Sequence, residues 1–179
     1  MKEILDWTFH IGIAVIIGLI IVNFVVQRTM VDGESMIPTL KSGDNLWVEK
    51  ISPKLGSFHY GEIVTVNVPL EIRKLYNKEK NPIIKRIIAL EGDTVEIKYG
   101  KVFVNGVPKS ESYINGSFTD ATGKPEYDKL KVPAGKNYVM GDNRGNSLDS
   151  RIIGPVDKKW VVGRAFFRFL PIKNFGFIK

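Results

Sequence analysis

The stretch T-V-E-I-K-Y-G-K-V-F-V-N, Thr94 to Asn105, contains two short runs of strand-forming residues joined through Gly100. In the first run Val95, Ile97 and Tyr99 alternate with charged residues, which is the two-residue period of a half-buried strand. Two such runs on either side of a glycine turn predict a β-hairpin, and a hairpin requires antiparallel pairing. The hairpin therefore predicts an antiparallel sheet in this part of the chain.

Further runs rich in β-branched and aromatic residues follow the same pattern, and each is bounded by Gly, Pro, Asn or Asp. Only residues 38–41 and 70–76 could form short helical turns, and nothing resembles a crossover helix. We expect residues 28–179 to form one mostly β domain built from antiparallel sheets. Residues 108–133 are polar and aperiodic, and are expected to form a mobile loop that leaves the sheet. The other predicted strands lie within residues 43–51, 61–69, 81–93, 137–146 and 160–170.

The composition bounds the class of protein. A chain of 179 residues suits one domain with an appendage, and 44% hydrophobic with 25% charged residues is in the globular range. The net charge of +7 would suit nucleic acid or anionic lipid, but no RNP, zinc-finger or helix-turn-helix pattern supports nucleic-acid binding. The absence of cysteine excludes disulfides, thiolate zinc sites and a cysteine nucleophile.

The N-terminal run Phe9 to Val26 carries no formal charge when His10 is neutral. At a rise of ~1.5 Å per residue such a run crosses most of a ~30 Å hydrocarbon layer. Residues 9–27 are therefore expected to form one transmembrane helix after a short segment, residues 1–8. A cleaved signal peptide is disfavoured because acidic residues precede the run and no small-residue cleavage site follows it. A buried core helix is disfavoured because the run has no polar stripe, and the flanking charges leave the orientation open.

Ser35 lies in V-D-G-E-S-M-I-P-T-L, Val31 to Leu40, which is either an ordinary turn or the site of a nucleophile. A serine hydroxyl needs a positioned base before it can attack a carbonyl. His10 lies in the apolar run, and no acidic partner is evident near His59. The G-x-S-x-G elbow is also missing, so a Ser-His-Asp triad is disfavoured.

Lys85 is the other candidate base. In the predicted strand N-P-I-I-K-R-I-I-A it shares a face with Ile83, Ile87 and Ala89, while Arg86 points to the opposite face. Burial among apolar groups would lower the pKa of the lysine from near 10.4 and leave a neutral amine. An inward lysine also protects edge strands from aggregation, and the strand alone does not distinguish the two roles.

The segment M-G-D-N-R-G-N-S-L-D-S-R, Met140 to Arg151, is either a polar turn or the hydrogen-bonded support of a site. Either of its serines could hydrogen-bond to a neutral lysine amine. Its two aspartates could pair with its two arginines, which would keep the acids from charging the lysine. The residues concerned are Asp142, Arg144, Ser147, Asp149, Ser150 and Arg151.

Together these segments resemble bacterial type I signal peptidases, which are membrane-anchored serine proteases with a Ser-Lys dyad, and they are most similar to the short Gram-positive form. The resemblance covers about Val31 to Pro171 and implies no metal or cofactor. The matching segments are G-E-S-M-I-P-T-L from Gly33, G-E-I-V-T-V-N-V-P from Gly61, K-R-I-I-A-L-E-G-D from Lys85, G-D-N-R-G-N-S-L-D-S-R from Gly141 and G-R-A-F-F-R-F-L-P from Gly163.

The resemblance implies that Ser35 is the nucleophile of an acyl-enzyme mechanism and that Lys85 is its general base. The backbone N–H of Ser35 would hold the oxyanion. Gly33 stands where some members have a second, hydroxyl donor, so that donor is left open. The supporting residues implied are Ser147, which would orient the amine, Asp149 and Arg151, which would form an ion pair, and Asp142, which would brace the turn.

Secretory pre-proteins are the substrates that the resemblance implies, cut after small residues in an A-x-A pattern. An extended peptide would pair with the strand before Ser35 and with the Lys85 strand. The protein would lie in the cell membrane with its N-terminus cytoplasmic and its catalytic domain outside, so membrane lipid is a second expected partner and nucleic acid is not one. The residues expected to line the substrate pockets are Met36, Leu40, Ile83 and Ile84.

Two other functions fit parts of the sequence. A self-cleaving Ser-Lys repressor is disfavoured because it would carry a DNA-binding domain where this chain has an apolar run. A membrane-tethered β domain that binds a partner without catalysis would not need Ser35, Lys85 and the 142–151 segment together.

Overall fold

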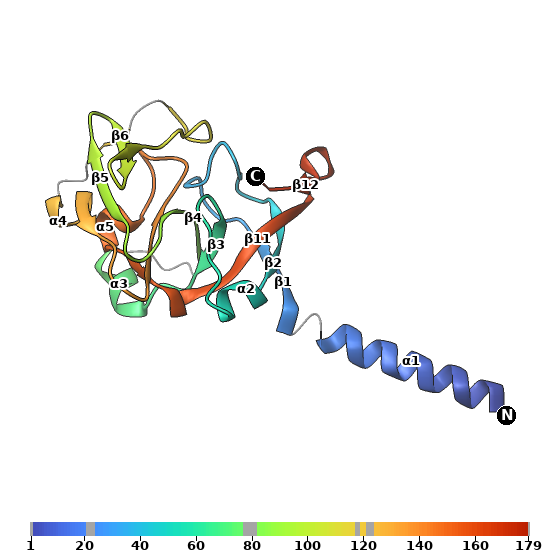
Figure 1. The fold of residues 1–179 in the computed structure, drawn as a ribbon. Coiled ribbons are helices and arrows are strands. Elements are labelled where there is room, and N and C mark those ends of the chain that lie inside the picture. Colours follow the sequence, from blue (N-terminus) through green and yellow to red (C-terminus); the bar gives the residue numbers. More distant parts are fainter. Residues whose placement is uncertain (1, 21–23, 77–81, 117–118, 121–123, 179) are drawn as a thin grey trace.

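The computed structural model describes residues 2–20, 24–76, 82–116, 119–120 and 124–178. The N-terminal helix α1 (Lys2–Ile20) projects from a β-rich body that contains the other described elements (Figure 1). Two antiparallel sheets make up this body, so the mostly β prediction is confirmed.

The larger sheet has the strand order β1-β2-β11-β3-β4-β9-β10, with β12 added beside β11. The ten-residue strand β11 pairs with both β2 and β3, and its register shifts after Val161, Ala165 and Arg168. Such bulges bend a strand and increase its twist, so β11 curls the sheet and brings distant segments together. The strands are β1 (Val26–Met30), β2 (Asn45–Glu49), β3 (Ile63–Val66), β4 (Ile83–Ala89), β9 (Lys136–Met140), β10 (Val156–Asp157), β11 (Val161–Leu170) and β12 (Gly176–Phe177).

The smaller sheet contains the predicted hairpin, which is confirmed with Val95 opposite Val104. Tyr99 and Gly100 form its turn, and their φ angles of 52° and 71° suit the tight turn that connects two twisted strands. Tyr99 is consequently 88% exposed, so its expected place on the buried face was wrong. The strand order is β7 (Val107–Pro108), β6 (Lys101–Val104), β5 (Thr94–Lys98) and β8 (Lys129–Lys131).

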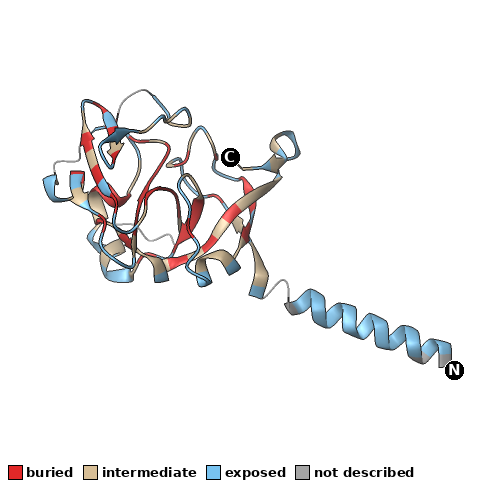
Figure 2. Ribbon diagram, viewed as in Figure 1, coloured by how far each residue is buried: buried red, intermediate tan, exposed pale blue. Residues whose placement is uncertain are grey.

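The buried core lies within and between the two sheets, whereas α1 is exposed along its described length (Figure 2). One core cluster joins the hairpin to β4 and β9 and includes Val95, Val102 and Tyr138. A second cluster lies beneath the Ser35 turn and includes Met36 and Leu40. The turn therefore rests on a packed apolar base.

Short helices connect the strands, and the helical turn predicted for residues 70–76 is present as α3. Residues 38–41 form a turn rather than a helix. Part of the polar 108–133 segment has regular structure, because β8 pairs with β5 and half-buried Leu130 packs on the core. A three-residue alternation was too short to reveal that strand. The helices are α2 (Ile51–Lys54), α3 (Leu70–Leu75), α4 (Pro125–Asp128), α5 (Ser150–Ile153), η2 (Lys158–Trp160) and η3 (Ile172–Asn174).

The N-terminal helix differs from its predicted boundaries. It begins at Lys2 rather than at Phe9, and Val26 and Gln27 belong to β1, where Val26 lies opposite Glu49. Residues 21–23 lie outside the described residues. The β-branched residues at the end of the apolar run suit a strand as well as a helix, which explains the error at that end. Among the described helices, none is both long enough and apolar enough to cross a membrane.

Candidate active site

The structure brings Ser35 and Lys85 together although 50 residues separate them. Lys85 Nζ lies 2.7 Å from Ser35 Oγ and also donates to the carbonyl of Ile84 at 2.8 Å. Lys85 belongs to β4 and is only 3% exposed, whereas Ser35 lies in the turn that follows β1. An amine in this position can exchange a proton with the serine hydroxyl, which is the geometry that nucleophile activation requires.

Backbone hydrogen bonds hold the Ser35 turn. The carbonyl of Ser35 accepts from the backbone N–H of Asn143 at 3.0 Å, and the Asn143 side chain donates to the carbonyl of Glu34. Within the turn, the N–H of Leu40 donates to the carbonyl of Met36. The 140–151 segment thus fixes the Ser35 turn from one side, and the apolar core cluster packs beneath it.

A cleft of about 420 Å³ opens beside the two side chains. Its walls are residues 29–33, Ser35 and Met36 on one side and residues 82–85, which include Ile83 and Ile84, on the other. Of the predicted pocket residues, the structure places Met36, Ile83 and Ile84 on this cleft. Leu40 is fully buried in the cluster beneath the turn, because the turn directs its side chain toward Leu46 and Val48.

Asp142 is held by Arg86, a partner that the sequence did not reveal. The guanidinium of Arg86 contacts both carboxylate oxygens, with Nε 2.9 Å from Oδ1 and Nη2 2.7 Å from Oδ2. Thr39 also donates to Oδ2 at 2.6 Å, and Arg86 Nη1 donates to the carbonyl of Gly61. The expected pairing of Asp142 with an arginine of its own segment was therefore wrong. The sequence contains one indication that Arg86 belongs to the site, which is that it follows Lys85 directly.

Asp149 and Arg151 form the expected ion pair, with two contacts of 2.9 Å. Asp149 also accepts from the backbone N–H of Gly141 at 3.0 Å, and Arg151 Nη2 donates to the carbonyl of Arg144. Burial by itself would raise the pKa of Asp149. The Arg151 guanidinium, the Gly141 N–H and the Ser147 hydroxyl outweigh that effect, so the pKa lies below its usual range.

The lowered pKa of Asp149 gives a stability prediction. A carboxylate with a lowered folded-state pKa contributes stability that is complete above its unfolded pKa of about 3.9 and is lost as the pH falls toward the folded value. We expect Asp149→Asn to remove this part of the acid dependence and to lower stability near neutral pH. Urea unfolding of the full chain between about pH 3 and pH 7 measures both effects. Exposed Glu71→Gln is the control, and an unchanged acid slope in Asp149→Asn would contradict the prediction.

Ser147 and Gly141 pack where the 140–151 segment meets the Ser35 turn. Ser147 Oγ is buried and, within the described part of the chain, has no hydrogen bond of standard geometry. Its lowering effect on the pKa of Asp149 places this hydroxyl near that carboxylate, and it makes no hydrogen bond to Lys85. Ser150 accepts instead from the backbone N–H of Val139. A Cβ added to Gly141 would run into both the Ser147 side chain and the carbonyl of Ser35, so this position has no room for a side chain.

We expect Gly141→Ala to displace the Ser35 turn and to lower strongly the rate of any reaction at this site, because misplacing a reacting group by about 1 Å can cost about 10²-fold in rate. The measurement is the turnover rate together with thermal unfolding. Gly145→Ala is the matched control in the same segment, since a Cβ there meets nothing within 4 Å. Full activity in Gly141→Ala would show that the turn can move without consequence.

Neither histidine contacts Ser35 in the described structure. His59 Nδ1 lies 3.1 Å from Glu62 Oε1, so the histidine does have an acidic neighbour that the sequence analysis overlooked. His10 hydrogen-bonds to the carbonyl of Asp6 within α1. No group of three or more His, Cys, Asp and Glu side chains among the described residues is arranged to hold a metal ion.

Comparison with known proteins defines the class. The family model described as signal peptidase, peptidase S26, matches residues 4–170. A signal peptidase I of Bacillus licheniformis is 39% identical over 97% of this chain and 92% of its own, and signal peptidase IB of Staphylococcus aureus is 35% identical over 97% and 93%. A crystal structure of signal peptidase I from Enterococcus faecalis V583 is 30% identical and aligns with 60% of this chain and 96% of its own, with a TM-score of 0.47. The chain is thus a hydrolase of the serine peptidase class. It belongs to the signal peptidase family, peptidase S26.

Proposed function

We propose that this chain removes N-terminal signal peptides from secretory pre-proteins by a Ser-Lys dyad acyl-enzyme mechanism. The observation that carries the proposal is the 2.7 Å separation of Lys85 Nζ and Ser35 Oγ at the wall of an open cleft. The names of the similar proteins, signal peptidase I, support the choice of substrate.

The reaction begins with Lys85 neutral, a state that burial favours because it penalises the charged form. As Ser35 Oγ attacks the scissile carbonyl carbon, its proton passes to Lys85 Nζ, and the oxyanion is held by the backbone N–H of Ser35. The new ammonium then protonates the leaving amine and the C–N bond breaks, leaving an ester on Ser35. Water attacks this ester while Lys85 takes a proton from the water. Lys85 then returns that proton to Ser35 Oγ as the ester C–O bond breaks, which releases the acid product and restores the free serine and the neutral amine.

An extended substrate fits between two strand edges. β3 pairs with one edge of β4, and β9 pairs with the other edge only from Arg86 onward. At Ile83 and Ile84 this second edge has no partner strand among the described residues, and it faces the cleft. Residues 29–33 face them across the cleft. A peptide strand inserted there would gain main-chain hydrogen bonds on both sides. Its alternate side chains would meet Met36, Ile83 and Ile84, and an A-x-A preference would follow if only small side chains fit against these residues.

The supporting residues have defined tasks in this proposal. The ion pair of Asp149 with Arg151 and that of Asp142 with Arg86 fix the 140–151 segment against the Ser35 turn. Ser147 would orient the lysine amine once the hydroxyl turns toward it. Gly33, with a φ of +103°, brings no side-chain donor to the oxyanion, so a backbone amide or water would supply the second hydrogen bond.

Attachment to the cell membrane through residues 9–27 belongs to the same proposal. Its support is the apolar sequence of that run and the outward exposure of apolar side chains along α1, such as Phe9, Ile13 and Ile17. The N-terminus would be cytoplasmic and the β-rich body extracytoplasmic, where secreted pre-proteins emerge. Lipid is then a partner and nucleic acid is not.

The test is incubation of the full chain in detergent with a secretory pre-protein, followed by mass spectrometry of the new N-terminus. Cleavage after an A-x-A site that both Ser35→Ala and Lys85→Ala abolish is the expected result. If the folded protein cleaves no pre-protein, it is a membrane-tethered binding domain and Ser35 is only a turn residue.

A further inference from the structure

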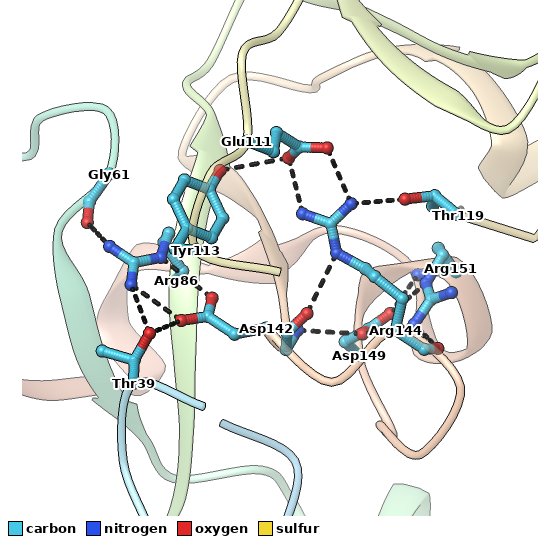
Figure 3. Close-up of polar contacts among 11 residues, drawn as sticks. Thr39, Gly61, Arg86, Glu111, Tyr113, Thr119, Asp142, Arg144, Asp149 and Arg151 are labelled. Atoms are coloured by element: carbon cyan, nitrogen blue, oxygen red, sulfur yellow. Dashed lines mark hydrogen bonds and ion pairs between the residues drawn. The ribbon is translucent and has the colours of Figure 1, made fainter. Parts of the chain in front are cut away.

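The polar segment that follows the hairpin reaches the site through Tyr113. The ring of Tyr113 faces the guanidinium of Arg86, with 4.1 Å between the guanidinium carbon and the ring centroid. The Tyr113 hydroxyl donates to Glu111 Oε1 at 3.0 Å (Figure 3). Burial, together with the nearby Glu111 carboxylate, raises the pKa of Tyr113, so its hydroxyl stays protonated and remains a donor.

Glu111 continues this set of contacts to a second arginine. Its two oxygens accept from Arg144 at 2.9 and 2.5 Å, and Thr119 Oγ1 accepts from the same guanidinium (Figure 3). Both side chains of the pair are almost fully buried, with 6% of Glu111 and 1% of Arg144 exposed. Arg144 Nε also donates to the carbonyl of Gly141 at 3.0 Å.

These contacts lead to both members of the dyad. At one end, Arg86 follows Lys85 in β4, so the Tyr113 ring fixes the strand that carries the base. At the other end, Gly141 packs against the carbonyl of Ser35, so Arg144, which donates to the carbonyl of Gly141, fixes the segment that supports the Ser35 turn. Glu111 and Tyr113 lie between the two ends, and neither lines the cleft.

We propose that Glu111 and Tyr113 are positioning residues that set the distance between Lys85 and Ser35 by holding Arg86 and Arg144. The inference rests on the proposed peptidase function. It gives residues 111–113 a part in positioning the site, although the sequence predicted a mobile loop over residues 108–133. Small displacements matter here, because about 1 Å of misplacement can cost about 10²-fold in rate.

The test measures kcat, KM and thermal unfolding of the full chain on a peptide that contains an A-x-A cleavage site. Tyr113→Leu and Glu111→Gln are expected to lower kcat by about 10- to 100-fold with KM within about twofold, since the cleft is untouched. Tyr113→Phe keeps the ring over Arg86 and should lose less, and Glu111→Asp should recover part of the rate by keeping the charge. Tyr99→Phe, in the exposed hairpin turn, is the matched control and should behave as the unsubstituted protein.

An unchanged kcat in folded Tyr113→Leu and Glu111→Gln would overturn the inference. So would a rise in KM that accounts for the whole loss, because the residues would then act on substrate binding. If Glu111→Gln does not fold, the comparison of Tyr113→Leu with Tyr113→Phe tests the positioning role. If the unsubstituted chain cleaves no peptide, the proposed function fails. The positioning role is then tested by measuring how fast a serine-directed acylating inhibitor labels Ser35 in each variant. Equal labelling rates in all variants, or no labelling of any of them, would overturn the positioning role.

Discussion

Lys85→Met is expected to remove peptidase activity while leaving the protein folded. Methionine fills a similar space without a proton acceptor of useful basicity, so Ser35 would lose its base, and general base catalysis is worth about 10²–10⁴-fold in rate. Lys85→Arg should be equally inactive, because a guanidinium stays protonated and cannot accept the serine proton. The measurement is kcat on a pre-protein or peptide with an A-x-A site.

Lys131→Met is the control for Lys85→Met, because Lys131 is an exposed lysine on a strand of the other sheet. Its activity should equal that of the unsubstituted chain. Substantial turnover by a folded Lys85→Met protein would exclude Lys85 as the base and would leave its contact with Ser35 without a chemical role.

Asp142→Ala is expected to cause the largest loss of stability, about 3–5 kcal/mol, because it leaves the buried Arg86 guanidinium without its counter-charge. Thr39 would lose its acceptor in the same step. Urea unfolding of the full chain measures this loss. Activity should fall as well. Without Asp142 the Arg86 side chain would shift, and because Arg86 follows Lys85 in β4, the shift would also displace Lys85.

The double replacement Arg86→Met with Asp142→Leu separates charge from packing. It removes both charges and keeps comparable volume, so much of the lost stability should return. A single Asp142→Ala variant that unfolds within about 1 kcal/mol of the unsubstituted chain would mean that water reaches Arg86 and solvates it.

Local pattern was sufficient for most of the longer strands, but not for β1, whose first residues were assigned to the apolar helix, or for the three-residue strand β8. The alternation around Val95 and Ile97 predicted the hairpin, and runs of β-branched residues predicted β2, β3, β4, β9 and β11. It was also sufficient to separate Lys85 from Arg86 on opposite faces of one strand. Pattern could not bring Ser35 next to Lys85, because nothing local relates residues 50 positions apart. The family resemblance supplied that pair, and the geometry now gives it a distance.

The missed contacts around Asp142 and Arg144 share one physical feature, which is that each joins segments far apart in the chain. Thr39 and Asp142 are 103 residues apart, and Arg144 and Glu111 are 33 apart. A buried charged side chain requires a charged or hydrogen-bonding partner, but the sequence does not show which residue the fold places beside it. Leu40 illustrates the same limit, since an apolar residue beside a cleft can face the cleft or the core.

The open edge of β4 at Ile83 and Ile84 has a consequence for handling the purified protein. A free strand edge accepts any extended chain, and in a concentrated preparation the nearest extended chains belong to neighbouring copies. We would expect slow self-association through this edge whenever no other strand fills it. A short, uncleavable, strand-shaped peptide should keep the preparation monodisperse, and it would be a starting point for inhibitors that imitate backbone rather than side chains.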